Sequence, residues 1–197
     1  MKTFSLYVAD TETTGLSDLD HSIIEISILR VNDNVQRTWC IAPHRFDTIQ
    51  MDALRINGHR IEDLKHLTEY GKNTYKSARD VIPDIENFFA DDAEPAENRI
   101  LVGQNPGFDL GFMQEMWKRE GSLDMFPFGS RPFTLDTRQI QVFLDLAFDE
   151  AEDYYNLGSL IKRYGVKNTK AHTAAADTLA TKEVFMGQLN KIKKLAK

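Results

Sequence analysis

The chain has very little cysteine and no long apolar run, and each absence excludes a class of protein. Cys40 is the single cysteine among 197 residues, which excludes an internal disulfide and any cysteine-rich zinc site. No apolar run approaches the roughly 18 residues that a membrane-spanning helix needs. Residues 1–9 are too short, and too soon followed by acidic residues, to form a secretion signal. We therefore expect a soluble, cytoplasmic protein of a reducing compartment that does not bind membranes.

A surplus of basic residues is missing as well. The chain has 24 lysines and arginines against 30 aspartates and glutamates, which gives a formal net charge of −6. Proteins that coat duplex DNA through its phosphates usually carry a strongly basic face, so we do not expect that activity here. An enzyme that meets phosphates through bound metal ions is compatible with this charge, because its metal-binding carboxylates lower the net charge.

What is present is typical of one globular domain. Hydrophobic residues make up 42% and charged residues 27% of the chain, and the two kinds are mixed along it. This composition excludes a disordered chain, a collagen-like chain and a coiled coil. The length suits one domain with a sizeable core, and no repeat or linker divides it. We therefore expect a single domain over residues 1–197.

Hydrophobic patterns predict strands first and then helices. Runs rich in β-branched residues predict the strands, and a polar turn at residues 32–34 joins two of them. Apolar residues at three- and four-residue spacing predict the helices, and Pro83 should kink or split the first of these. Strands are expected over residues 4–9, 23–31, 35–41 and 99–103, and helices over residues 75–90, 108–120, 136–147, 155–164 and 173–194. This order predicts a mixed sheet covered by helices.

Two acidic residues end the apolar face of the first strand. Because side chains alternate across a strand, Asp10 and Glu12 lie on the same face as Val8. Two like charges at adjacent positions on one face repel each other and raise each other's pKa. A bound cation would remove that repulsion. The pair therefore indicates a cation site at the end of this strand.

Two further acids continue the apolar stripes of helices. Asp109 lies three and four residues before apolar positions, and Asp177 lies three and seven residues before others. Both are near the expected start of a helix, where the helix dipole favours an ionised carboxylate. Together with Asp10 and Glu12 they form an oxygen-rich ligand set suited to Mg²⁺ or Mn²⁺ and not to zinc.

A histidine accompanies these acids. His172 precedes Asp177 by five residues, which is too far around a helix to share a face, so we expect it in the preceding loop. A histidine beside a metal cluster is suited to general-base catalysis near neutral pH. Each residue also has a structural alternative. Asp10 would end a strand and Asp109 would cap a helix. Asp177 would lie on a solvated flank of its helix, and His172 would be an ordinary loop histidine. That alternative fits each residue singly but fits the ordered set poorly.

Three ordered motifs resemble those of the DnaQ-like DEDDh 3′–5′ exonucleases. Residues 8–16 (VADTETTGL) resemble the first motif, residues 103–113 (GQNPGFDLGFM) the second, and residues 172–181 (HTAAADTLAT) the third. Residues 132–137 (PFTLDT) and 157–166 (LGSLIKRYGV) match softer features of the family. The resemblance spans nearly the whole chain. It implies an α/β, RNase H-like fold: a five-stranded mixed sheet flanked by helices, with the second strand antiparallel to the others.

The resemblance also implies roles for particular residues. The catalytic and metal-binding set is Asp10, Glu12, Asp109, Asp177 and His172. The substrate-binding set is Thr13, Leu16, Asn105 and Phe108. By this resemblance the four acids would hold two divalent cations, Mg²⁺ or Mn²⁺, and the histidine would deprotonate the attacking water.

The implied function is metal-dependent hydrolysis of single-stranded DNA from its 3′ end, with release of nucleoside 5′-monophosphates, in replication proofreading or repair. Two alternatives stay open. A 3′–5′ RNA exonuclease would use the same residues, because DNA and RNA differ at contacts to the 2′-hydroxyl. A non-catalytic nucleic-acid-binding module is disfavoured by the intact set of acids. A DNA polymerase is a candidate partner, although the chain lacks the extended tail by which the bacterial replicase proofreading subunit joins its polymerase.

Overall fold

The sheet is built around its first strand. The structure is a computed structural model that describes residues 4–67, 69–70, 73–168 and 172–195. The strands are β1 (Ser5–Thr13), β2 (Ile23–Arg30), β3 (Val35–Ile41), β4 (Glu69–Tyr70), β5 (Asn73–Lys76), β6 (Arg99–Gly103) and β7 (Phe133–Asp136). In the described residues they form one sheet in the order β4-β5-β3-β2-β1-β6-β7. β2 runs antiparallel to β1 and β3, whereas β6 and β7 continue parallel to β1, which confirms the expected mixed sheet.

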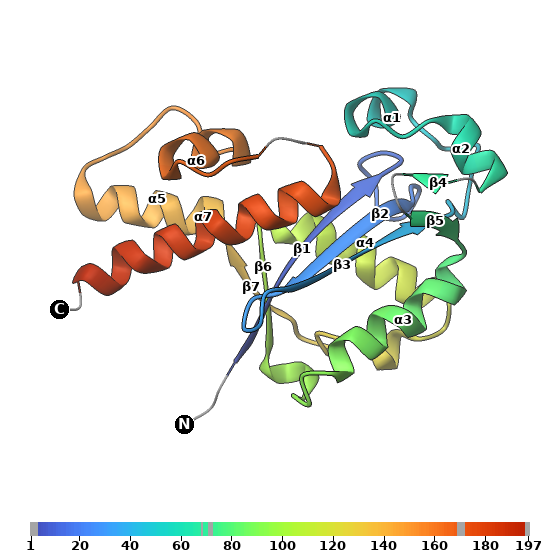
Figure 1. Cartoon of the computed structure of the whole chain (residues 1–197), viewed down its shortest axis with the longest axis horizontal. Helices are drawn as coiled ribbons and strands as arrows, with labels where there is room; N and C mark the ends of the chain where they lie inside the picture. The colour runs from blue at the N-terminus through green and yellow to red at the C-terminus, as the bar shows by residue number, and fades with distance from the viewer. Residues whose placement is uncertain (1–3, 68, 71–72, 169–171, 196–197) are drawn as a thin grey trace.

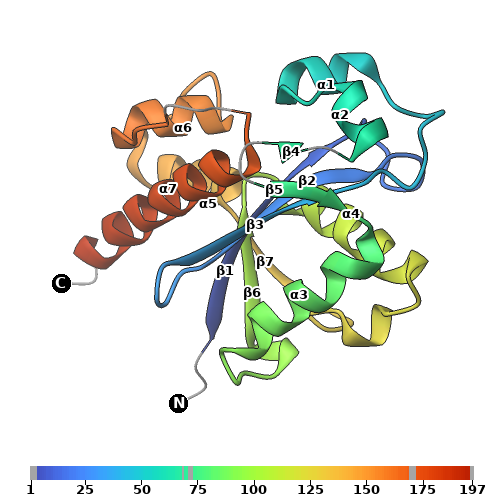
Figure 2. The same ribbon diagram turned by 45° about the vertical axis from the view of Figure 1, so that its right-hand side comes forward.

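Helices cover both faces of this sheet. They are α1 (Met51–Asn57), α2 (Ile61–His66), α3 (Ala78–Ala90), α4 (Pro106–Arg119), α5 (Thr137–Phe148), α6 (Leu157–Tyr164) and α7 (Ala174–Leu195). α7 packs across β1 and β2 with α5 and α6 beside it, and α3 and α4 lie on the opposite face (Figures 1 and 2). α1 lies beyond the end of β1, which α4 and α7 also approach. Within the described residues, no helix is long and apolar enough to cross a membrane.

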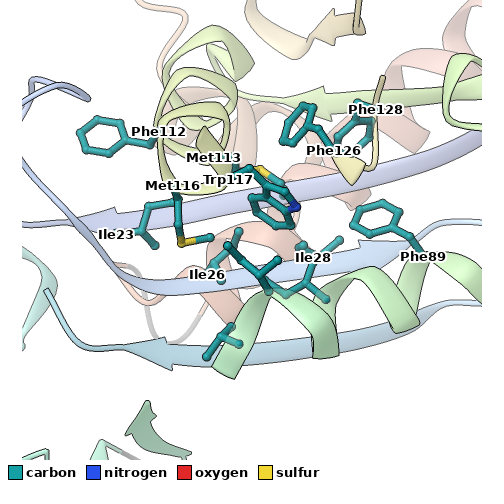
Figure 3. Close-up of a cluster of buried hydrophobic side chains, with 14 of the residues drawn as sticks. Ile23, Ile26, Ile28, Phe89, Phe112, Met113, Met116, Trp117, Phe126 and Phe128 are labelled. Atoms are coloured by element: carbon teal, nitrogen blue, oxygen red, sulfur yellow. The ribbon is translucent and has the colours of Figure 1, made fainter. Parts of the chain in front are cut away.

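Alternation along β1 supplies apolar side chains to both faces. Tyr7 packs against Phe88 and Phe89 of α3, in the same buried cluster as Trp117 of α4, part of which Figure 3 shows. Val8 points to the other face, where it packs with Phe185 of α7. Because both faces of the strand are buried, the position of its last residues relative to α4 and α7 is fixed.

Several boundaries differ from the sequence expectations. β1 continues to Thr13 because its pairing with β2 extends past Ala9. The helix expected from residue 75 begins at Ala78, because Tyr75 instead pairs with β3 as part of β5. Pro83 does not split α3, because it lies on an exposed side of the helix and removes only one backbone hydrogen bond. The sequence patterns predict neither α1 and α2 nor the short strands β4, β5 and β7. β4 and β5 extend the five-stranded sheet that the resemblance implies.

Candidate active site

The end of β1 brings acidic side chains together. Asp10 and Glu12 lie two and four residues beyond Val8, on the face of β1 that packs against α7, and Asp177 lies in the first turn of α7. One oxygen of each of these three partly buried carboxylates lies within 4.8 Å of the other two. Carboxylate oxygens at this spacing suit a hard divalent cation. The structure therefore gathers three of the four acids that the sequence assigns to a cation site.

Asp109 lies beside this group but is held differently. It is in the first turn of α4, as expected, and is buried. Its Oδ1 accepts hydrogen bonds from the backbone N–H of Thr11 at 2.9 Å and from the Thr11 hydroxyl at 2.7 Å. These two bonds lock the start of α4 to β1. Asp109 is therefore fixed beside the three clustered acids by its bonds to β1.

Burial and mutual repulsion shift the acids strongly toward their neutral forms. Burial, and then the charges of Asp109 and Glu12, raise the pKa of Asp10 well above its ordinary value. Burial and the charge of Glu25 raise the pKa of Glu12 to about 8. Burial raises the pKa of Asp109 to about 7, against the lowering effect of its Thr11 bonds. A cluster that resists ionisation on its own is one that a bound cation would stabilise.

His172 lies in the loop before α7, as the sequence predicts. Its backbone is left-handed, with φ 67°, and its side chain is exposed. Its N–H donates to Oδ2 of Asp177 at 2.9 Å, and Asn168 donates from Nδ2 to Oδ1 of Asp177 at 2.6 Å. Both oxygens of Asp177 are thus oriented by the loop. The side chain of His172 is thus on the solvent side of Asp177.

A pocket of about 330 Å³ adjoins the acids. Glu12 is one of its lining residues, and the others are Thr11, Thr13, Leu16, Gln50, Asp52, Ala53, Ile56, Asn57 and Phe108. Leu16 is 80% exposed at the mouth of the pocket, where an apolar side chain of this size is well placed to contact a base. Three of the four substrate-binding residues predicted from the sequence therefore line one pocket.

Asn105, the fourth predicted substrate-binding residue, is not part of that lining. It precedes α4 in a left-handed conformation, with φ 60°. Its backbone N–H donates to Oδ1 of Asp136 at 3.1 Å, and the guanidinium of Arg138 lies 3.4 Å from its side-chain oxygen. Asn105 and Arg138 are both exposed, so this corner adds a cation that the sequence analysis did not single out.

Comparison with known proteins assigns the chain to a family. The sequence model of the family RNase_T, described as Exonuclease, matches residues 7–185. The chain belongs to this exonuclease family. It is 27% identical over 199 residues to a PolC-type DNA polymerase III of Staphylococcus aureus, a match that covers 99% of the chain but only 12% of the polymerase. A PolC-type polymerase of Staphylococcus saprophyticus is equally similar over 195 residues, again with 12% of its length covered.

Solved nuclease structures share the fold of this chain. A zinc-bound complex of Escherichia coli ExoI with single-stranded DNA superposes with a TM-score of 0.74 at 17% identity, over 97% of this chain and 41% of that one. Cell-death related nuclease 4 superposes with a TM-score of 0.72 at 15% identity, over 96% of this chain and 65% of that one. The likeness confirms the RNase H-like fold. Family membership supports a nuclease role for the chain.

Besides Arg138, two polar residues of this candidate site were not predicted from the sequence. Glu25 is a buried acid in the apolar strand β2, directly opposite Glu12 in the strand pairing. An acid inside an apolar strand is a signal that the sequence does contain. Asn168, which holds Asp177, carries no such signal, because it belongs to a loop and its contact depends on how that loop folds.

Proposed function

We propose that the chain is a 3′–5′ exonuclease domain over residues 1–197 that hydrolyses single-stranded DNA and releases nucleoside 5′-monophosphates, in proofreading or repair. The observation that carries this proposal is the cluster of Asp10, Glu12 and Asp177 beside a pocket that shares Glu12 and is bounded by Leu16. Family membership supports hydrolysis of nucleic acid, and the similarity to PolC-type polymerases and to ExoI with single-stranded DNA supports DNA as the substrate.

The donor set fits divalent metal ions. Asp10, Glu12 and Asp177 supply carboxylate oxygens, and Asp109 is close enough to raise the pKa of Asp10 by its charge. In this proposal the four acids hold two Mg²⁺ or Mn²⁺ ions, which when bound would neutralise the charge that develops on the scissile phosphate. All four proposed ligands are carboxylates, whereas structural zinc sites are typically built from cysteine and histidine.

The remaining residues of the site orient the substrate and move a proton. His172 acts as general base and takes the proton of the attacking water on its imidazole. Leu16 and Phe108 hold the terminal base between apolar surfaces, and the ring of Phe108 is itself supported by Phe112 at 4.9 Å between centroids. Thr13 lies in the same lining. Asn105 and Arg138 contact the strand outside the pocket, where a cation suits a phosphate.

The substrate is tested with single-stranded DNA and RNA oligonucleotides of the same sequence. We expect the DNA oligonucleotide to be degraded in a reaction that requires Mg²⁺ or Mn²⁺, and the RNA oligonucleotide to be degraded more slowly. Zn²⁺ is assayed in parallel. Faster turnover of RNA than of DNA would replace this proposal by an RNA exonuclease. Tight binding of either oligonucleotide without any turnover would replace it by a binding module.

A DNA polymerase is the proposed partner, because the relatives described as PolC-type polymerases carry the matching segment within a much longer chain. Co-purification from the source cells under native conditions, followed by a polymerase assay of the purified complex, tests this. Recovery of the chain without polymerase activity at any salt concentration contradicts it.

A further inference from the structure

Glu25 is a buried carboxylate that the proposed chemistry does not use. It lies in β2 among apolar residues and Ser27, and its side chain is only 5% exposed. It also faces Glu12 across the β1–β2 ladder, where two like charges repel each other. A buried acid in such a place needs partners that offset its desolvation.

One partner of Glu25 is the beginning of α7. The first N–H groups of a helix have no acceptor within the helix. Oε2 of Glu25 accepts from the backbone N–H of Ala174, the first residue of α7, at 3.3 Å. Two later N–H groups of this turn, those of Ala176 and Asp177, donate to the carbonyl of Thr173 at 3.0 Å. Glu25 therefore caps α7 from a strand that lies 149 residues earlier in the chain.

The other partner is His59, in the short connection between α1 and α2. Its Nε2 lies 3.5 Å from the same Oε2 of Glu25, and its side chain is fully buried. Its Nδ1 is hydrogen-bonded to the hydroxyl of Tyr75, a buried residue of β5. Tyr75 thus fixes the ring of His59, and His59 faces the oxygen of Glu25 that holds Ala174. This series of contacts joins β5 to α7.

The backbone around the start of α7 carries the two site residues whose positions depend on these contacts, His172 and Asp177. Ala174 follows His172 by two residues and precedes Asp177 by three, and His172 and Asp177 are joined by the 2.9 Å bond described above. A second attachment lies nearby, where Gln36 of β3 donates to the carbonyl of Ala175 at 2.7 Å. The start of α7 is therefore held to the sheet through its backbone rather than through apolar packing alone.

We propose that Glu25, which lies against His59, is a positioning residue that fixes the start of α7 and so places His172 and Asp177 against Asp10 and Glu12. The inference rests on the proposed nuclease function for its catalytic consequence. Its structural consequence, a local loosening of α7 when Glu25 is removed, is independent of that function. A misplacement of about 1 Å in a catalytic group can lower turnover by as much as roughly 100-fold.

The test compares Glu25→Ala, Glu25→Gln and Tyr75→Phe with the exposed control Glu97→Gln. Amide hydrogen exchange of the metal-free proteins is followed for residues 174–178 and for β6, together with kcat and KM on a DNA oligonucleotide. In Glu25→Ala we expect exchange of residues 174–178 to quicken on the order of tenfold. We also expect kcat to fall about 10- to 100-fold with KM nearly unchanged.

The other variants separate positioning from general stability. Glu25→Gln keeps an oxygen that accepts from Ala174, so it should retain most of the turnover and protection of the parent. Tyr75→Phe removes only the hydroxyl that holds His59 and should shift both readouts slightly in the direction of Glu25→Ala. Folded Glu25→Ala with parental exchange at residues 174–178 overturns the inference, as does an equal quickening of exchange in β6. A parent that does not degrade DNA contradicts the proposed function instead and leaves the exchange result to decide the role of Glu25.

Discussion

Asp10 is the residue on which burial and repulsion act together most strongly. Its pKa is raised by burial and by the charges of Asp109, Glu12 and Asp177. Replacing it with an isosteric amide removes one of the interacting charges and leaves the packing of β1 unchanged. Its contributions to folding and to function should therefore have opposite signs, which makes the residue informative about both.

We predict that Asp10→Asn abolishes nuclease activity while leaving the melting temperature of the metal-free protein equal to or above that of the parent. Saturating Mg²⁺ at about 100 times its dissociation constant should stabilise the parent by about 2.7 kcal/mol and the variant much less. Thermal unfolding with and without Mg²⁺ measures both. Asp84→Asn, an exposed change on α3, serves as the control. Equal Mg²⁺-induced shifts in parent and Asp10→Asn would show that Asp10 is not a ligand.

His172 offers a contrasting case, because it is exposed and only its backbone N–H contacts Asp177. We predict that His172→Ala lowers kcat by roughly 10²- to 10⁴-fold, the usual contribution of a positioned general base. The Mg²⁺-induced rise in melting temperature should persist, because the carboxylates are intact. Steady-state kinetics at saturating Mg²⁺ measure the effect, with exposed His66→Ala as the matched control. Parental turnover in His172→Ala would contradict a general-base role for His172.

The sequence predicts the residues of this site better than it predicts their contacts. Strand alternation places Asp10 and Glu12 on one face, and the structure agrees, because alternation is a local property of the backbone. The bonds of Asp109 to Thr11 and of Asn168 to Asp177 join segments whose approach depends on the whole fold. No local pattern in the sequence carries that information.

Short elements depend on tertiary packing in the same way. α1 and α2 have seven and six residues, and neither has a side-chain cap at its start, so the sequence lacks the usual signals for them. They are held by Leu54 and Leu64, which pack on Ile24 and Cys40. β5 likewise forms because Tyr75 pairs with β3. This pairing takes residues 75 and 76 out of the helix that the apolar spacing predicts from residue 75.

Pro83 lowers the stability of α3 without breaking the helix. Pro83 lies in the interior of α3 and lacks the N–H that would bond to the carbonyl of Arg79. We predict that Pro83→Ala raises the free energy of unfolding by about 2 kcal/mol, after allowance for the more flexible unfolded chain, and leaves nuclease activity unchanged. Urea denaturation measures this against Asp84→Ala, a neighbouring exposed change expected to be nearly neutral. A loss of stability in Pro83→Ala would mean that the ring of Pro83 packs in a way that α3 needs.

The acidic cluster should also govern how the stability of the whole molecule depends on pH. The folded-state pKa values of Glu12 and Asp109, about 8 and about 7, lie above their ordinary values of 4.5 and 3.8. Between these limits the folded protein retains protons that the unfolded chain has released. The stabilising contribution is therefore complete below about pH 4 and is lost as the pH rises through 7 and 8.

We predict that in EDTA the urea midpoint falls between pH 5 and pH 8, and that saturating Mg²⁺ reduces or reverses this fall by binding the ionised carboxylates. Glu12→Gln, which cannot ionise, should show a shallower dependence in EDTA. A midpoint that is constant or rises over this range in EDTA would contradict the raised pKa values of these acids.

The sequence predicts where the longer strands lie along the chain, but not the order of the strands in the sheet. Hydrophobic runs predict β1, β2, β3 and β6, and the polar turn at residues 32–34 makes β2 and β3 antiparallel. The antiparallel pairing of β2 with β1 follows only from the resemblance to the exonucleases. That topology matters because it brings β1, α4 and α7 to one place, and each of them carries an acid of the site.

The most direct measurement is the product pattern from a 5′-labelled single-stranded DNA oligonucleotide with Mg²⁺. We predict a ladder that shortens one nucleotide at a time from the 3′ end, with nucleoside 5′-monophosphates as the small products, and an intact oligonucleotide with EDTA or with Asp10→Asn. Early release of the label as a mononucleotide, or the same ladder in excess EDTA, would contradict a metal-dependent 3′–5′ exonuclease site formed by Asp10, Glu12 and Asp177.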